Sequence, residues 1–184
     1  MSYCKIAPAH PLHGPYHDRE YGFPVSDEAA LFERLVLEIN QAGLSWSTIL
    51  NKRQNFRIAY DNFEVDRVAS YGVTERSRLL SDGGIVRNRL KIDAAIENAR
   101  RIRELRASDG SLAEWLARHH PLSKPDWVKL FKKTFAFTGG EITGEFLLSI
   151  GYLPGAHEEG CPVYAKIARR KPPWMLRAPE RQQA

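Results

Sequence analysis

The stretch from Asp27 to Trp46 has the clearest pattern of apolar and polar positions in the chain. It predicts an amphipathic helix that begins at Ser26 or Asp27, whose side chains can accept bonds from free backbone N–H groups. Gly43 is expected to end the helix, because glycine commonly follows the last helical turn. At about 100° of rotation per residue, the apolar face consists of Leu31, Phe32, Leu35, Ile39 and Ala42.

Glu38 falls in the middle of this apolar face. An ionised carboxylate is costly to bury unless it is paired or hydrogen-bonded, so Glu38 must have a protein partner, be protonated, or meet a ligand. Trp46 follows the end of the helix and offers a flat π-face, so the two residues could hold a flat, electron-poor ring. In the alternative interpretation, Glu38 caps a neighbouring helix or pairs with a buried arginine, and Trp46 belongs to the core. The pattern leaves both interpretations open.

Helical spacing recurs along the chain, and no stretch shows sustained alternation of apolar and polar residues, so the predicted class is all-α. Residues 1–25 contain four prolines and little periodicity, which indicates a mostly irregular arm. We expect one helical domain over residues 1–165 and a basic, disordered tail over residues 166–184. Further helices are predicted over residues 46–59, 63–69, 74–81, 111–119, 125–133 and 141–150, and around residues 92–102.

The composition narrows the class of protein. The chain lacks an apolar run of the roughly 20 residues that span a bilayer, and its first residues lack the apolar core of a signal peptide. We therefore expect a cytoplasmic protein that does not associate with membranes. The two cysteines, Cys4 and Cys161, are too few for a disulfide framework.

The net charge of +5 is distributed unevenly along the chain. Residues 76–106 hold nine arginines and lysines against four acidic residues, and the predicted tail is also basic. Within residues 76–106, two adjacent glycines join two predicted helices, and such glycines let a backbone approach another surface closely. The second helix presents its positive N-terminus, which suits a phosphate group. The segment resembles a helix-hairpin-helix, although the turn can also be only a connection; the predicted DNA contacts are Gly83, Gly84, Val86, Arg87 and Lys91.

Four potential metal ligands lie near the two ends of the chain. His157 and Cys161 are four residues apart, close enough to bind one ion, and Cys4 and His17 form a matching pair. Together they would make a tetrahedral zinc site that joins the two ends of the domain. The spacing of Cys4 and His17 is not that of a standard zinc finger. Two unrelated free thiols, or a Cys4–Cys161 disulfide in an oxidising compartment, are the alternatives.

Several of these segments resemble the bacterial DNA-3-methyladenine glycosylase I family. The similarity runs from Cys4 to Cys161, and its most specific parts are Gln-Ala-Gly-Leu-Ser-Trp at residues 41–46 and the split set of Cys and His ligands. The other similar segments are residues 16–24, 37–38 and 84–92.

The resemblance implies an all-helical, helix-hairpin-helix glycosylase that flips a methylated adenine out of double-stranded DNA and hydrolyses its N-glycosidic bond. The matching Glu38 would recognise the base edge and is the candidate catalytic residue, while Tyr16 and Trp46 would line the pocket. The zinc would be structural and would tie the N-terminal arm to the C-terminal region. Because 3-methyladenine is cationic within DNA, it is already a good leaving group, and binding by a carboxylate and an indole can supply most of the selection. We assign no general base and expect a monomer.

The chain departs from the family where part of the pocket wall is expected. Ile6 stands where the family usually has tryptophan, and His13 where a tyrosine is common. Residues 139–145 replace a stretch rich in threonine and introduce Glu141 and Glu145, which either form a solvated face or place one carboxylate in the cleft. The alternative functions are therefore the same fold acting on another base lesion, or a non-catalytic helix-hairpin-helix DNA-binding protein.

Overall fold

The computed structural model describes residues 2–176, and these residues form helices and no strand. The all-α prediction is confirmed. No helix among them is both long and apolar enough to cross a bilayer. The elements are α1 (Tyr3–Ile6), α2 (His13–Arg19), α3 (Glu28–Gln41), α4 (Trp46–Ala59), η1 (Asp61–Phe63), α5 (Val65–Ala69), α6 (Val73–Ser81), α7 (Arg89–Asp109), α8 (Leu112–His119), α9 (Lys124–Thr134), α10 (Gly140–Ser149), α11 (Pro162–Arg169) and η2 (Pro173–Met175), where η denotes a 3₁₀ helix.

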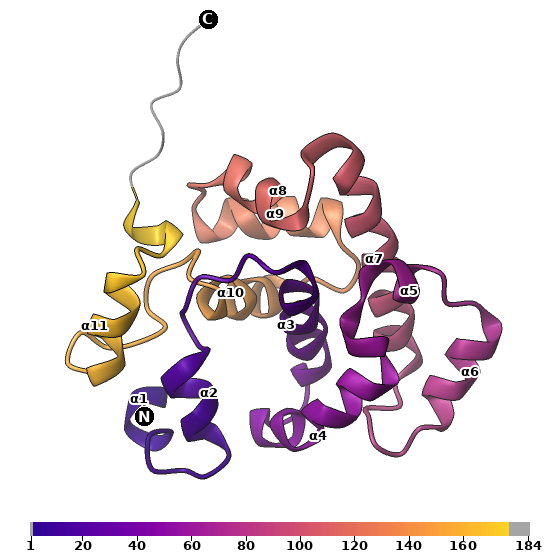
Figure 1. Cartoon of the computed structure of the whole chain (residues 1–184), viewed down its shortest axis with the longest axis horizontal. Coiled ribbons are helices and arrows are strands. Elements are labelled where there is room, and N and C mark those ends of the chain that lie inside the picture. Colours follow the sequence, from indigo (N-terminus) through magenta and orange to yellow (C-terminus); the bar gives the residue numbers. More distant parts are fainter. Residues whose placement is uncertain (1, 177–184) are drawn as a thin grey trace, which may run out of the picture.

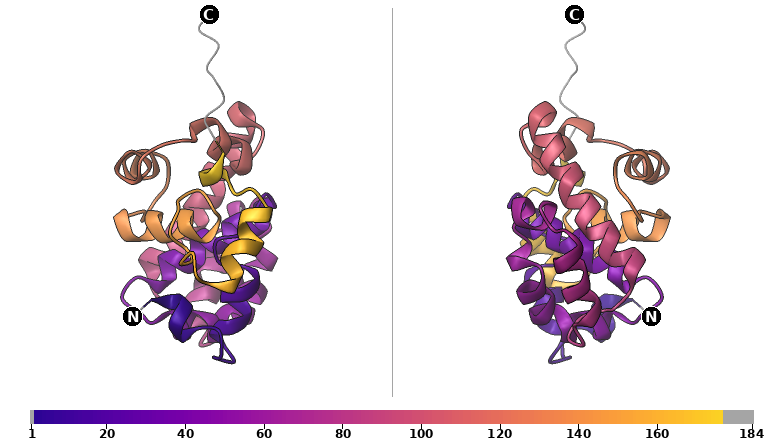
Figure 2. Two further views of the ribbon diagram at one scale, coloured as in Figure 1. Left: turned by 90° about the vertical axis from the view of Figure 1, so that its left-hand side faces the viewer. Right: turned by 90° about the vertical axis from the view of Figure 1, so that its right-hand side faces the viewer.

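Helix α3 lies at the centre of the molecule, with α10 packed beside it (Figure 1). Helices α4 to α7 form one side, α8 and α9 cover another, and α1, α2 and α11 lie together on the remaining side. The side views also place α11 against α1 and α2, although these segments are far apart in the sequence (Figure 2). One large apolar core surrounds α3, and a smaller apolar cluster lies under α11.

Helix α3 begins and ends where the sequence predicts. The carboxylate of Asp27 caps its first turn by accepting a hydrogen bond from Ala30 N at 2.8 Å. After its last turn, Gly43 adopts a φ of +79°, which costs glycine little. Every residue from Leu31 to Asn40 is buried, so this helix carries its polar side chains into the interior.

The two ends of the chain differ from the prediction. The N-terminal arm contains α1 and α2, and Pro15 fits within the first turn of α2 because N–H groups there have no partner inside the helix. Helix α11 starts at Pro162 and continues through Arg169, followed by η2. The predicted start of the tail at residue 166 therefore falls inside a helix, and residues 177–184 lie outside the described residues.

A buried network of ion pairs joins α2, α3 and α4. Arg53 of α4 donates to Glu33 of α3 at 2.9 Å and to Glu20, which follows α2, at 2.7 Å. Arg57 also binds Glu33 at 2.7 Å, and Arg34 binds Glu20 at 2.7 Å. The side chains of Arg53 and Glu33 are 13% and 7% exposed. Arg53 and Glu33 are therefore largely removed from water and depend on each other for balance, whereas Glu20 and Arg57 are about a third exposed.

Arg53→Met keeps the apolar stem of the side chain and removes the charge that links both carboxylates. We expect the free energy of unfolding to fall by about 3 kcal/mol, because a buried partner is left incompletely balanced. Urea denaturation followed by circular dichroism measures it. Arg67→Met removes an exposed pair with Glu64 and is the control, with an expected change below about 1 kcal/mol. Equal effects of the two substitutions would contradict the structural role of the network.

Candidate active site and metal centre

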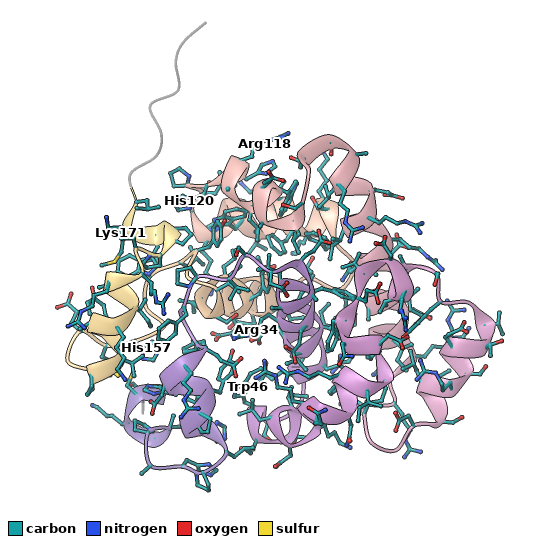
Figure 3. All side chains as sticks on the ribbon, viewed as in Figure 1. Arg34, Trp46, Arg118, His120, His157 and Lys171 are labelled. Atoms are coloured by element: carbon teal, nitrogen blue, oxygen red, sulfur yellow. The ribbon has the colours of Figure 1, made fainter. Side chains whose placement is uncertain are left out.

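A cavity of about 290 Å³ lies beside the C-terminal half of α3. In Figure 3, the labelled Trp46 lies between the N-terminal helices and α4. The three residues predicted to bind a base all line this cavity. The full lining consists of Tyr3, Tyr16, Tyr21, Glu38, Gln41, Trp46 and Glu145.

Glu38 is only 4% exposed in this pocket. Within residues 2–176, its carboxyl group has no hydrogen-bond or ion-pair partner. Arg34 of the same helix does not pair with it, because its guanidinium donates to Tyr16 Oη at 3.1 Å and to Glu20 Oε2 at 2.7 Å. Glu38 caps no helix among these residues either. The interpretation of Glu38 as a structural partner is therefore not supported.

Burial sets the protonation of Glu38. Desolvation, followed by the nearby Glu145 carboxylate, raises the pKa of Glu38 from its ordinary 4.5 to about 8, against a smaller opposing effect of Arg34. This environment therefore favours the protonated, uncharged carboxyl group at neutral pH. A ligand with a positive charge would favour the ionised form.

Tyr16 and Trp46 form an aromatic wall of the pocket. Their ring centroids lie 5.1 Å apart, with 59° between the ring planes. Tyr16 is 3% exposed, and the Arg34 guanidinium lies 4.8 Å from its ring centroid. Trp46 is the first residue of α4 and remains partly exposed. Its indole face is thus accessible to a flat ring.

Three lining residues were not identified from the sequence: Tyr3, Tyr21 and Gln41. Gln41 follows Glu38 by three residues, and this helical spacing could have identified it. Tyr3 and Tyr21 each lie within four residues of a metal-site residue, Cys4 or His17, but their direction depends on how the N-terminal arm folds.

The two N-terminal departures from the family pattern lie outside the pocket lining. Ile6 is 52% exposed at the end of α1. His13 supports a lining residue instead, because its Nδ1 lies 3.1 Å from Tyr3 Oη and its Nε2 lies 2.7 Å from Ser47 Oγ. It therefore connects the pocket wall to α4.

Cys4, His17, His157 and Cys161 come together, and one ligand atom of each lies within 4.8 Å of the others. The sulfur atoms of Cys4 and Cys161 each lie 3.5 Å from His157 Nδ1, and Cys161 Sγ lies 3.8 Å from His17 Nε2. Ligand bonds of about 2.0–2.3 Å in a zinc tetrahedron separate the ligand atoms by roughly 3.3–3.8 Å. Both cysteines are free. This group could hold a metal ion.

The histidines are also oriented for such an ion. His17 Nδ1 lies 2.7 Å from Asp18 Oδ1, and His157 Nε2 lies 2.8 Å from the Tyr21 carbonyl oxygen. These contacts leave the opposite ring nitrogens facing the thiols, as is usual for metal-binding histidines. Figure 3 shows His157 between α11 and the N-terminal helices. The cluster therefore joins the two ends of the described chain.

The turn between α6 and α7 contains the two predicted glycines. Gly83 is exposed, and a Cβ atom there would meet nothing within 4 Å. Lys52 Nζ of α4 donates to the carbonyl oxygens of Gly83 and Gly84 at 3.0 and 3.2 Å. The N–H of Gly84 donates to Asp82 Oδ1 at 2.7 Å. The turn is thereby fixed to α4, the helix that begins at the pocket.

Most of the predicted positive patch is engaged inside the protein. The guanidinium groups of Arg76, Arg78, Arg100, Arg101 and Arg106 bind carboxylates or backbone carbonyls. Arg87 is exposed, and no hydrogen bond or ion pair within residues 2–176 engages it, while Val86 beside it is half-buried. The open positive charge is therefore smaller than the sequence suggested.

Lys91 differs from its predicted role as a phosphate contact. It is 5% exposed, and its ammonium group donates to the carbonyl oxygens of Asn40, at 2.9 Å, and Ala42. It therefore satisfies free carbonyls at the C-terminus of α3, where a positive charge is favourable. The reason is tertiary: α7 packs against α3 and turns this side chain inward.

The chain is similar to proteins of one family in both sequence and structure. A model of the methyladenine glycosylase family matches residues 6–126, which include Tyr16, Glu38 and Trp46. The chain is 34% identical to DNA-3-methyladenine glycosylase 1 of Escherichia coli (strain K12), with 89% of this chain and 97% of the relative covered. It is 30% identical to DNA-3-methyladenine glycosylase of Haemophilus influenzae, with 80% and 89% covered. A structure on 3-methyladenine recognition by 3-methyladenine DNA glycosylase I from Staphylococcus aureus matches with a TM-score of 0.80 and 28% identity, covering 89% of this chain and 97% of that one.

Proposed function

The chain belongs to the methyladenine glycosylase family, and we propose that its Glu38 recognises the damaged base in a pocket walled by Tyr16 and Trp46. The protein is a DNA glycosylase that excises 3-methyladenine from DNA. This membership supports an enzyme over the alternative of a non-catalytic DNA-binding protein.

The buried Glu38 carboxyl group without a protein partner is the observation that supports this proposal. An adenine methylated at N3 and attached to deoxyribose carries a positive charge. On entering the pocket, it supplies the opposite charge that Glu38 lacks, while the Trp46 face adds cation–π attraction. Since the ionised form of Glu38 is then favoured, binding of the base releases the proton that the Glu38 carboxyl group otherwise holds.

The cationic base also explains why the pocket needs no general acid. When the bond between C1′ and N9 breaks, its electron pair stays on the base, which leaves as neutral 3-methyladenine. Water adds its oxygen to C1′ and gives up a proton to solvent. Glu38 acts by holding the cationic base in position during this step, and it does so best in the ionised form.

The base-release assay tests this function directly. Purified protein is incubated with methylated double-stranded DNA, and the released bases are separated by chromatography. We expect 3-methyladenine as a product, with unmodified adenine retained in the DNA. Release of a different methylated base in its place would overturn the proposed role of the pocket.

We further propose that the α6–α7 turn binds the backbone of double-stranded DNA as a helix-hairpin-helix, through Gly83, Gly84, Val86 and Arg87. Its exposed Gly83 allows close approach, and the N-terminus of α7 adds partial positive charge. Since Lys52 fixes the turn to α4, a duplex held there has a defined position relative to Trp46. Lys91 has no part in this surface.

Gly83→Val and Arg87→Glu are expected to weaken binding to all duplex sequences alike, by about tenfold or more, because backbone contacts carry no sequence information. A Cβ at Gly83 has free space within the protein, so the melting temperature should not change. Fluorescence anisotropy at several salt concentrations measures the duplex affinity of each variant. Loss of binding to only some sequences would contradict the proposal. Deletion of residues 177–184, which removes two arginines, controls for general charge.

We also propose that the cluster of Cys4, His17, His157 and Cys161 binds zinc with a structural role. The ligand types, their separations and the bonds to both histidines support zinc. The cluster lies outside the pocket lining, so the metal would stabilise the arm that carries Tyr3, Tyr16 and Tyr21. The monomeric state and the cytoplasmic location stay predictions.

A further inference from the structure

Helix α10 places a second carboxylate in the pocket. Glu145 lines the same cavity as Glu38, whereas Glu141, one turn earlier on α10, is exposed. Tyr21 Oη donates to Glu145 Oε2 at 3.3 Å. Tyr21 is itself held, because His157 Nε2 contacts its carbonyl oxygen at 2.8 Å. Glu145 therefore has a defined place in the pocket wall.

No cation within residues 2–176 forms an ion pair with Glu145. Its hydrogen-bond partner, Tyr21, is a neutral donor. Arg34 is bound to Glu20, and Lys124 lies against Gly144, on a different face of α10. Among the described residues, the pocket lining therefore contains two carboxyl groups and no cationic side chain.

We propose that Glu145 is a specificity-determining residue that, together with Glu38, makes the pocket selective for purines that carry a positive charge. This role for Glu145 rests on the proposed role of the pocket in base recognition. It goes beyond that role because it assigns the selectivity to two carboxylates, which lie on different helices.

The electrostatics of the pocket support this assignment. The Glu145 carboxylate is, after burial, the main cause of the raised pKa of Glu38. The same field that resists a second negative charge attracts a positive one, and it is strong where water is excluded. A neutral purine has no net charge for this field to attract. The second carboxylate thus increases the difference in affinity between a charged and a neutral ring.

Two small ligands of similar shape test the proposal. The 3,9-dimethyladeninium ion carries a fixed positive charge, and 9-methyladenine is neutral; calorimetry gives the affinity of the full chain for each. We expect Glu145→Gln to weaken binding of the cation about tenfold and to leave that of the neutral base unchanged. Glu141→Gln, the matched control on the exposed side of α10, should change neither affinity. Glu145→Asp keeps the charge and should keep the preference for the cation over the neutral base. This second variant keeps the proposal testable if Glu145→Gln folds poorly, because loss of the preference in Glu145→Asp would also contradict it.

The outcomes separate this proposal from the function on which it rests. If Glu145→Gln weakens both ligands equally, Glu145 only shapes the pocket and the proposal fails. If it changes neither affinity, while the parent protein still prefers the cation, the selectivity belongs to Glu38 alone and the proposal also fails. A parent protein that binds both ligands equally would overturn the proposed base-recognition role of the pocket itself.

Discussion

Glu38→Gln is expected to lower the rate of 3-methyladenine excision about 100-fold or more while the protein stays folded. The substitution keeps the size of the side chain and removes the charge that meets the cationic base, and loss of one member of a desolvated charge pair costs about 2–5 kcal/mol. Single-turnover kinetics on methylated DNA measure the rate. Binding to undamaged DNA should not change, because undamaged DNA offers the pocket no cationic base.

Glu33→Gln is the matched control for this substitution. Glu33 is also a buried carboxylate of α3, but Arg53 and Arg57 pair with it. Its substitution should cost stability and leave the preference for 3-methyladenine intact, the opposite of the result at Glu38. A stable Glu38→Gln variant with the parent rate would overturn the role of Glu38 in the pocket, and Glu145 would then be the next residue to test.

The Glu38→Gln variant should also be more stable than the parent protein, by an amount that depends on pH. The folded state raises the pKa of Glu38 from 4.5 to about 8, so the unfolded chain releases this proton at a lower pH than the folded protein. The stability that the proton contributes is complete below pH 4.5 and is lost as the pH rises through about 8. Glu38→Gln lacks this loss. Its melting temperature should therefore exceed that of the parent increasingly between pH 5 and pH 8, with DNA absent.

Removal of the proposed zinc ion should have the largest effect on stability. Zinc at a free concentration about 1,000 times its dissociation constant stabilises the folded protein by about 4 kcal/mol. Loss of this stabilisation corresponds to a fall of roughly 8–16 °C in melting temperature for a chain of this length. The same loss is expected for Cys161→Ser. Because ligands come from both ends of the chain, the effect should reach the whole domain and loosen the pocket wall as well. Calorimetry with and without a chelator measures it.

His10→Ala is the control for the metal site. His10 lies in the same N-terminal arm, outside the cluster, and is exposed. Its Nδ1 accepts hydrogen bonds from Leu12 N and His13 N, so the substitution can cost some stability, but it should leave the metal content unchanged. Elemental analysis should find about one zinc per chain in freshly purified protein. A stable protein without zinc, or with a Cys4–Cys161 disulfide, would contradict the proposed centre.

The order of apolar and polar residues was sufficient to predict the helices of the chain body. The ends of α3 were predicted at Asp27 and Gly43, because capping and helix termination depend on neighbouring residues alone. The position of Glu38 on the apolar face followed from helical geometry. The family resemblance then predicted the place of Tyr16 in the pocket, the set of zinc ligands and the reaction. The N-terminal arm contains two short helices that the sequence did not predict, and α11 continues past residue 165. Such short helices form mainly through packing, here around the small apolar cluster of α11.

The direction of individual side chains was decided by the tertiary structure. Lys91 and Arg87 lie in one basic segment, yet α7 packs Lys91 onto the carbonyls of α3 and leaves Arg87 exposed. Glu141 and Glu145 are one turn apart, yet only Glu145 lines the pocket. The sequence alone determined the helices of the chain body, from α3 to α10, and which residues carry charge. Only the packing of α10 against α3 decided that Glu38 has a second carboxylate nearby, because residues far apart in the chain meet only in the folded state.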